Sequence, residues 1–117
     1  MNLEAYRKYC LSKKGVTEEF PFGEDVLVYK VMGKMFSLTD IGEFSSINLK
    51  VEPERGVELR ERYPSVLPGY HMNKKHWITV LMDGSVPDAE IRLWTDESYS
   101  LVVAGLTKSQ KKALETS

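Results

Sequence analysis

The sequence predicts an α+β protein, a two-layer sandwich in which helices cover one face of a mainly antiparallel sheet. Residues 45–51 (SSINLKV) alternate polar and apolar side chains with the period of two that is typical of a strand. Residues 91–102 instead place their apolar side chains at helical spacing. Short turns join the first expected strands, which favours antiparallel pairing and the element order α-β-β-β-α-β-α.

The N-terminal part of the chain predicts a helix and then a pair of strands. The helix begins after a cap at Asn2, runs to about Lys13 and stops at Gly15. Its apolar stripe consists of Leu3, Tyr6, Cys10 and Leu11. Residues 17–25 (TEEFPFGED) contain Pro and Gly and are expected to form a loop. Residues 26–38 then predict two strands that are joined at Met32-Gly33.

The C-terminal part predicts two further helices, a strand between them and a short tail helix. Pro53 suits the first turn of a helix that extends to Tyr63, and residues 63–69 are expected to form a loop. A strand over residues 76–82 precedes a capping box at Ser85-x-x-Asp88. The following helix ends at Gly105 and buries a stripe of Ile91, Trp94, Ser98, Leu101 and Val102. Thr107-x-x-Gln110 opens a basic tail helix, KSQKKALE.

Composition limits the classes of protein to which the chain can belong. Its 117 residues suit one domain over residues 1–117, and 42% hydrophobic residues are enough for a core. One cysteine and the lack of an apolar span or a signal-peptide core predict a cytoplasmic protein that is not inserted in a membrane. The net charge is −1, but residues 26–82 hold eight bases and six acids. The middle of the chain is therefore its basic part.

The sequence contains no recognisable catalytic or metal-binding motif. Nucleophile elbows, phosphate-binding glycine loops and H-E-x-x-H are absent, and Cys10 lies on the apolar stripe of the first helix, as a core residue would. His71 and His76 are five residues apart, which would place them on opposite faces of a strand. We therefore expect no catalytic residue, no metal site and no cofactor, and hence a protein that is not an enzyme.

Residues 69–80 (GYHMNKKHWITV) are the candidate binding segment. Three residues with hydrogen-bond donors lie together just before a strand: Asn73, Lys74 and Lys75. Such donors suit phosphate contacts, and Trp77 next to them suits stacking on a base if its ring is exposed. The alternatives are a lysine-rich turn that only keeps the chain soluble, and a Trp77 that is part of the core. His76 could align with Ile78 and be partly buried, or it could be functional. Asn48 and Lys50, on the polar face of the third expected strand, would extend the same surface.

Three segments give the chain a resemblance to a known family. They are FPFGEDVLVYKVMGKMF (20–36), INLKVEPERGVELRERYPSVLPGYHMNKKHW (47–77) and SYSLVVAGLTK (98–108). Together they closely resemble the MmcQ/YjbR family. The resemblance implies a CyaY-like (frataxin-like) fold and similarity to a "double wing" DNA-binding module, in which sheet hairpins would meet the duplex. Frataxin binds iron through acids on its first helix, but residues 3–14 here carry one acid and four bases, so we expect no iron delivery.

The first functional hypothesis is therefore a weak, mostly electrostatic DNA-binding module. Phosphate contacts are assigned to Lys50, Lys74 and Lys75, with Lys30 or Lys34 contributing from the first hairpin. The remaining predicted contact residues are Asn48, His71, Asn73 and Trp77. The alternative is a protein-interaction or regulatory domain that uses the same open sheet face, and a third hypothesis is a small-molecule site around His71 and His76. The sequence does not indicate an oligomeric state.

Overall fold

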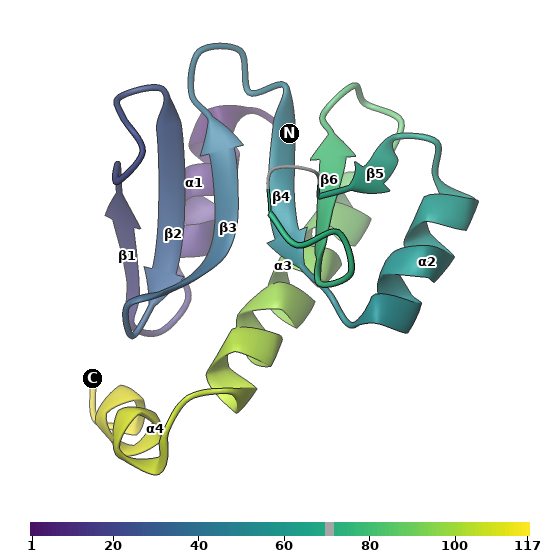
Figure 1. Ribbon diagram of the computed structural model, residues 1–117. Helices are drawn as coiled ribbons and strands as arrows, with labels where there is room; N and C mark the ends of the chain where they lie inside the picture. The colour runs from purple at the N-terminus through teal and green to yellow at the C-terminus, as the bar shows by residue number, and fades with distance from the viewer. Residues whose placement is uncertain (70–71) are drawn as a thin grey trace.

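The computed structural model describes residues 1–69 and 72–117 and confirms an α+β fold with an open antiparallel sheet of six strands, in the order β1-β2-β3-β4-β6-β5 (Figure 1). The strands are β1 (Val16–Glu19), β2 (Val26–Val31), β3 (Lys34–Asp40), β4 (Ser46–Lys50), β5 (Val66–Pro68) and β6 (Trp77–Leu81). The helices are α1 (Leu3–Leu11), α2 (Pro53–Arg62), α3 (Asp88–Ala104) and α4 (Lys108–Glu115).

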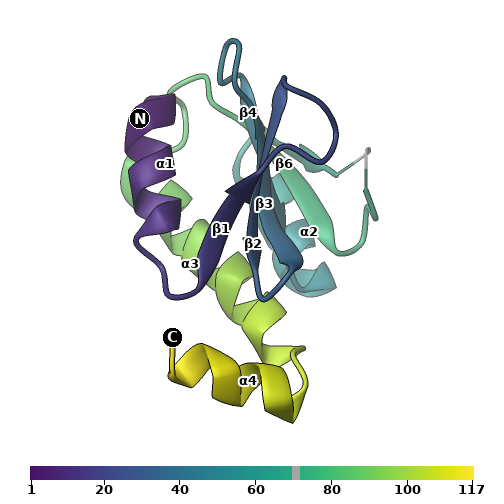
Figure 2. The same cartoon turned by 90° about the vertical axis from the view of Figure 1, so that its left-hand side faces the viewer.

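Helices α1 and α3 cover one face of the sheet (Figure 2), and α2 packs at the β5 edge. The core between them is aromatic and aliphatic. Tyr6 of α1 and Trp94 of α3 are almost fully buried, as is Phe36 of β3. The Tyr6 hydroxyl lies 2.7 Å from the Ser37 hydroxyl, which links α1 to β3 inside the core. The predicted burial of Trp94 and Cys10 is confirmed.

Two predicted loops contain short strands. Residues 17–25 were expected to be a loop, yet β1 pairs with β2 as an edge strand. Residues 63–69 were also expected to be a loop, yet β5 pairs with β6 at the opposite edge. Both strands are short. Pro68 is tolerated at the end of β5 because β5 is an edge strand, where the missing N–H of proline costs no hydrogen bond within the sheet. Their stabilisation comes from pairing with a neighbour and not from an alternating pattern of their own.

The predicted capping box at the start of α3 is wrong. The helix begins at Asp88 after Pro87, and no side chain caps it. Ser85 instead donates its backbone N–H to the Asp83 carboxylate over 2.9 Å, while its hydroxyl bonds to that of Ser65. Hydrogen bonds from the side chains of Ser85 and Ser65, together with the Ser85 N–H, lower the pKa of Asp83 to about 2. The capping box at Thr107 and Gln110 is present as predicted.

Helix α4 is attached beside the start of β1. Its Leu114 side chain occupies the space above Gly15, where an added Cβ would lie 2.4 Å from Leu114 Cδ1. Lys14 Nζ also donates to the carbonyl of Glu115 over 2.7 Å. Figure 1 shows α4 beyond the lower end of the sheet. The basic tail helix therefore lies near the end of the sheet at which β1 begins.

Candidate nucleic-acid interface

The face of the sheet opposite α1 and α3 carries two of the predicted contact residues on β4. In β4, Ile47 and Leu49 are buried in the core, so Asn48 and Lys50 project from the other face, as predicted. Asn48 Oδ1 accepts a hydrogen bond from the Thr79 hydroxyl over 2.6 Å. This cross-strand bond holds the Asn48 carboxamide against β6.

Acidic residues gather at one end of the sheet. Antiparallel pairing brings together the end of β1, the start of β2, the end of β3, the start of β4 and the end of β6. These segments and the loops next to them carry Glu19, Glu24, Asp25, Asp40, Glu43 and Asp83, and they contain no Lys or Arg. We call this the acidic end.

Lysines gather at the opposite end, which we call the lysine end and define as Lys30, Lys34, Lys50, Lys74 and Lys75. The β2–β3 turn, the last residue of β4 and the residues before β6 meet here because their strands are antiparallel. Lys50 is paired in register with Trp77, and Lys34 with Val31. The segments 30–35, 50–51 and 73–77 contain no Asp or Glu. The strand ends of this chain of net charge −1 therefore carry opposite charges, although the Lys30–Glu19 ion pair joins the two groups at the β1–β2 edge and Glu52 follows Val51.

The lysines differ in their availability to a ligand. Lys30 Nζ is already paired with Glu19, at 3.2 Å. Lys34 and Lys75 are exposed, Lys50 is half-buried, and within the described part of the chain these three form no ion pair. The β2–β3 turn that presents Lys34 has φ of 51° at Met32 and 81° at Gly33, which suits a tight two-residue hairpin. The structure thus leaves Lys34, Lys50 and Lys75 as the best-placed cations.

The loop before β6 is organised by Asn73. Its side-chain oxygen accepts the N–H of Lys75 over 2.9 Å, and its carbonyl accepts the N–H groups of His76 and Trp77. His76 is exposed, so the alternative of partial burial beside Ile78 is not the one that the structure supports: the strand begins only at Trp77, and the alternation does not reach His76. His71 lies outside the described residues.

Trp77 is only 8% exposed, so the exposed aromatic that was considered for stacking is not present. It lies on the helix-free side of β6, as its spacing predicts, and Gly69 packs against its Cβ and backbone. The Gly69 N–H donates to the Trp77 carbonyl over 2.9 Å, and a Cβ at Gly69 would lie 2.7 Å from Trp77 Cβ. The alternative of a buried structural tryptophan is therefore the one that the structure supports.

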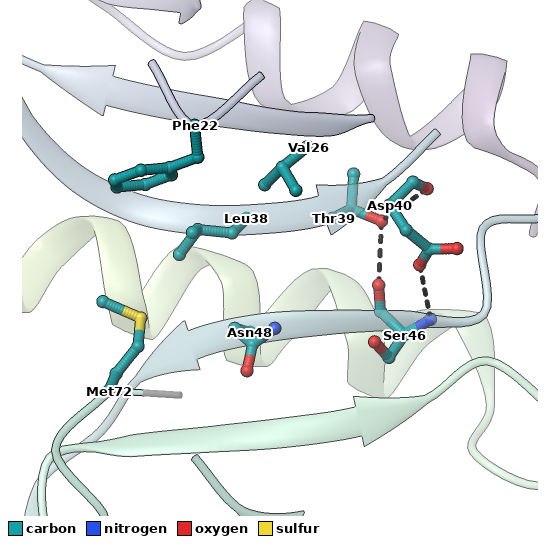
Figure 3. A pocket seen from close by; sticks show the side chains of 8 residues that line it. All are labelled: Phe22, Val26, Leu38, Thr39, Asp40, Ser46, Asn48 and Met72. Atoms are coloured by element: carbon teal, nitrogen blue, oxygen red, sulfur yellow. Dashed lines mark hydrogen bonds between the residues drawn. The ribbon is translucent and has the colours of Figure 1, made fainter. Parts of the chain in front are cut away.

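A cavity of about 430 Å³ on the same face was not predicted (Figure 3). It is lined by Phe22, Val26, Leu38, Thr39, Asp40, Ser46, Asn48 and Met72. Phe22 comes from the β1–β2 loop and is 61% exposed. The sequence signal was the FPF segment, whose two aromatic residues flank a proline in a loop.

The titratable side chains of Cys10 and Glu18 stabilise the fold and do not form a reactive site. Burial raises the pKa of the Cys10 thiol to about 12, which keeps it protonated and unreactive at neutral pH. Arg7 and the Tyr29 hydroxyl bind the Glu18 carboxylate, and the pKa of Glu18 is lowered.

Among the residues that the structure describes, no three His, Cys, Asp or Glu side chains are grouped as metal ligands. Within the same residues no helix is long and apolar enough to cross a membrane.

The fold and this face define the class of the protein as a small α+β module with an open, charge-polarised sheet, and comparisons identify its family. The model of the YjbR family matches residues 11–101, and the chain belongs to this family. It is 42% identical over 110 residues to YbdF of Escherichia coli O157:H7, which covers 93% of this chain and 90% of that protein. It is 31% identical to YjbR of Escherichia coli K12, over 97% of this chain and 98% of that protein.

Solved structures agree with the family assignment. The crystal structure of Deinococcus radiodurans DR2400, described as a DUF419 domain, matches with a TM-score of 0.91 and 42% identity over 97% of this chain and 88% of that chain. A Pseudomonas syringae protein matches with a TM-score of 0.73 and 31% identity over 86% of this chain and 98% of that chain.

Proposed function

We propose that this protein is a non-enzymatic DNA-binding module of the cytoplasm that contacts the phosphate backbone through its lysine end. The observation that carries the proposal is the separation of charge between the two ends of the sheet. Exposed charges more than about 8–10 Å apart are largely screened at physiological ionic strength. A phosphate at the lysine end would therefore experience the local lysines more strongly than the net charge of −1.

The shape of this end fits backbone contact more than base readout. Its cations come from a hairpin turn, a strand end and a loop, and no helix of the described residues occupies this part of the face. Burial of Trp77 removes the aromatic platform that single-strand binding commonly uses. We therefore propose double-stranded DNA as the ligand, bound with little sequence preference. The resemblance to double-wing modules, in which hairpins meet the duplex, supports the same geometry.

Helix α4 adds cations near this end. Lys108, Lys111 and Lys112 are exposed on α4, which is held at Gly15 beside the start of β1. None of the three forms an ion pair within the described residues. They give a duplex at the lysine end a second row of phosphate contacts. Binding should remain weak, with a Kd of about 10⁻⁴ to 10⁻⁶ M at physiological salt, as for non-specific complexes.

The test is fluorescence anisotropy with a labelled duplex of about 20 base pairs at several KCl concentrations. Each phosphate contact contributes about 0.9 to the slope of log affinity against log salt, so the combined Lys34→Ala, Lys50→Ala and Lys75→Ala variant should lower the slope by up to about 2.7. The matched control is Lys8→Ala, Arg62→Ala and Arg92→Ala, which changes the charge equally at exposed positions on the helices.

The control variant should keep a slope close to that of the wild-type protein. Equal loss of affinity in both triple variants would mean that only net charge matters, and it would remove the lysine end from the proposal. Absence of binding by the wild-type protein at 25 mM KCl, roughly the most favourable condition for phosphate contacts, would reject DNA binding itself.

A second candidate function is protein interaction through the β1–β2 loop. Phe20 and Phe22 are 50% and 61% exposed, and exposed aromatic residues are typical anchors of protein interfaces. A photo-crosslinking residue at position 20 should then give one discrete cross-linked product in cells. The same residue at Val57, an exposed apolar position on α2, is the control and should give none.

A further inference from the structure

The cavity on the helix-free face lies toward the acidic end and is separate from the lysine end. Val26, Asp40 and Ser46, which line it, stand at strand ends on the acidic side of the sheet. Its volume of about 430 Å³ is within the range of small-molecule sites, roughly 300–1,000 Å³. The proposed DNA contacts therefore do not explain it.

The walls of the cavity are apolar. Phe22 and Met72 come from two separate loops and lie on opposite sides of Leu38, with Val26 on the side of Phe22 (Figure 3). An apolar group that enters here would bury the exposed ring of Phe22 as well as its own surface. Each Å² of apolar surface removed from water favours the complex, which gives the cavity a general affinity for an apolar body.

The polar groups of the cavity leave few free hydrogen-bonding positions. The Asp40 carboxylate accepts the N–H groups of Ser45 and Ser46, at 2.9 and 3.1 Å, and the Thr39 hydroxyl donates to the Ser46 carbonyl. Asn48 Oδ1 already accepts a hydrogen bond from the Thr79 hydroxyl. Within the described residues the Asn48 amide nitrogen has no partner, so its N–H groups are donors available to a ligand.

The charge of the cavity selects against anions. Burial acts to raise the pKa of Asp40, but the N–H groups of Ser45 and Ser46 outweigh it and the pKa is lowered. Asp40 is therefore ionised at neutral pH and repels an anionic ligand. Its oxygens already accept hydrogen bonds from the backbone, which leaves them little capacity to accept further hydrogen bonds from a ligand.

We propose that this cavity binds a small neutral molecule with an apolar body and a carbonyl oxygen that accepts a hydrogen bond from Asn48 Nδ2. The apolar body lies between Phe22, Leu38 and Met72, and the carbonyl points toward Asn48. The site is a binding site and involves no covalent step. It gives the module a ligand-binding function in addition to the proposed DNA contacts.

The test uses acetophenone and ethylbenzene as probes, which have nearly the same size and differ in the carbonyl oxygen. The full chain, labelled with ¹⁵N, is titrated with each probe while ¹⁵N–¹H spectra report backbone amides and the Asn48 side-chain amide. Acetophenone should bind saturably in the millimolar range that is usual for fragments of about nine heavy atoms, and it should shift the Asn48 side-chain signals. Ethylbenzene should bind about threefold to tenfold more weakly, because it lacks one neutral hydrogen bond.

Two variants make the test specific. Asn48→Asp keeps an acceptor for Thr79 and removes both N–H donors, so it should weaken acetophenone about threefold to tenfold and leave ethylbenzene unchanged. Phe22→Ala should weaken both probes. Phe20→Ala is the matched control from the same loop, because Phe20 is exposed and does not line the cavity, and it should change neither probe.

Three results would overturn the proposal. The first is the absence of saturable shifts with acetophenone at soluble concentrations. The second is equal affinity for both probes together with no effect of Asn48→Asp, which would leave an apolar surface suited to a side chain of a partner protein. The third is equal weakening by Phe20→Ala and Phe22→Ala, which would place binding on the loop surface and not in the cavity.

Discussion

Replacement of Trp94 tests the packing of α3 on the sheet and the state of a buried donor. Trp94 is 1% exposed, and its ring lies edge-on to Tyr63 with centroids 5.1 Å apart. A buried tryptophan removes about 150–250 Å² from water, which at about 25 cal/mol/Å² corresponds to roughly 4–6 kcal/mol. Against this, the indole Nε1 is buried without a hydrogen-bond partner in the described part of the chain. Such an unpaired donor costs about 1–3 kcal/mol.

The two opposing contributions predict different results for two substitutions. Trp94→Ala should lower the free energy of unfolding by about 3–5 kcal/mol, because it leaves a cavity. Trp94→Phe keeps a ring against Tyr63 and removes the unpaired donor, so it should lower the free energy by at most about 2 kcal/mol. Urea denaturation followed by far-UV circular dichroism measures both, provided that the slope m is unchanged. A Trp94→Ala variant with the wild-type midpoint would refute the packing, and equal losses in both variants would refute the unpaired-donor argument.

Three further predictions concern a close contact, an ion pair and metal binding. Gly69→Ala should lower the free energy of unfolding by about 1–3 kcal/mol, because the added Cβ would meet Trp77. Gly42→Ala is the control and should have little effect, because the space around Gly42 is open. Equal urea midpoints for the two variants would contradict the contact. The lowered pKa of Glu18 beside Arg7 means that this ion pair stabilises the fold above the unfolded pKa of about 4.3 and is lost as the pH falls through the folded pKa. Because Arg7 is partly exposed and solvent screens the pair, Glu18→Gln should cost about 0.5–1.5 kcal/mol at pH 7. A pH series of urea titrations should show this difference shrinking in acid, while a constant difference would argue against the pair. Equimolar Zn²⁺ or Fe²⁺ should leave the melting temperature unchanged in differential scanning calorimetry, and a clear increase would reveal a site that sequence reasoning missed.

The sequence predicts best those elements that bury one face in the core, because burial imposes a regular spacing of apolar residues. Strand β4 lies within the sheet with one face in the core, so its residues must alternate, and α3 must place Trp94 and Ser98 on the same side. The edge strands β1 and β5 were missed because each pairs on one side only. Ser85 fits the sequence pattern of a capping box. Its hydroxyl is instead hydrogen-bonded to Ser65, and its N–H donates to Asp83.

The candidate interface was predictable only in part, because it depends on how strands pair. Lys34 and Lys75 are 41 positions apart in the chain, and the antiparallel register brings their segments to the same end of the sheet. The alternation in β6 correctly placed Trp77 on the helix-free side. It could not show that Trp77 is buried or that Gly69 packs against its Cβ, because both depend on the path of a loop. The Phe22 cavity was missed for the same reason.

The most direct test of the DNA-binding proposal is the position of a bound duplex on the protein. ¹⁵N–¹H spectra of the full chain, recorded at low salt with an unlabelled duplex of about 20 base pairs, report each backbone amide separately. The proposal predicts that the largest shifts occur around Lys34, Lys50 and Lys75, that they disappear as KCl is raised, and that residues 20–25 at the acidic end do not respond. Shifts centred on residues 20–25, or on α1 and α3, would contradict it.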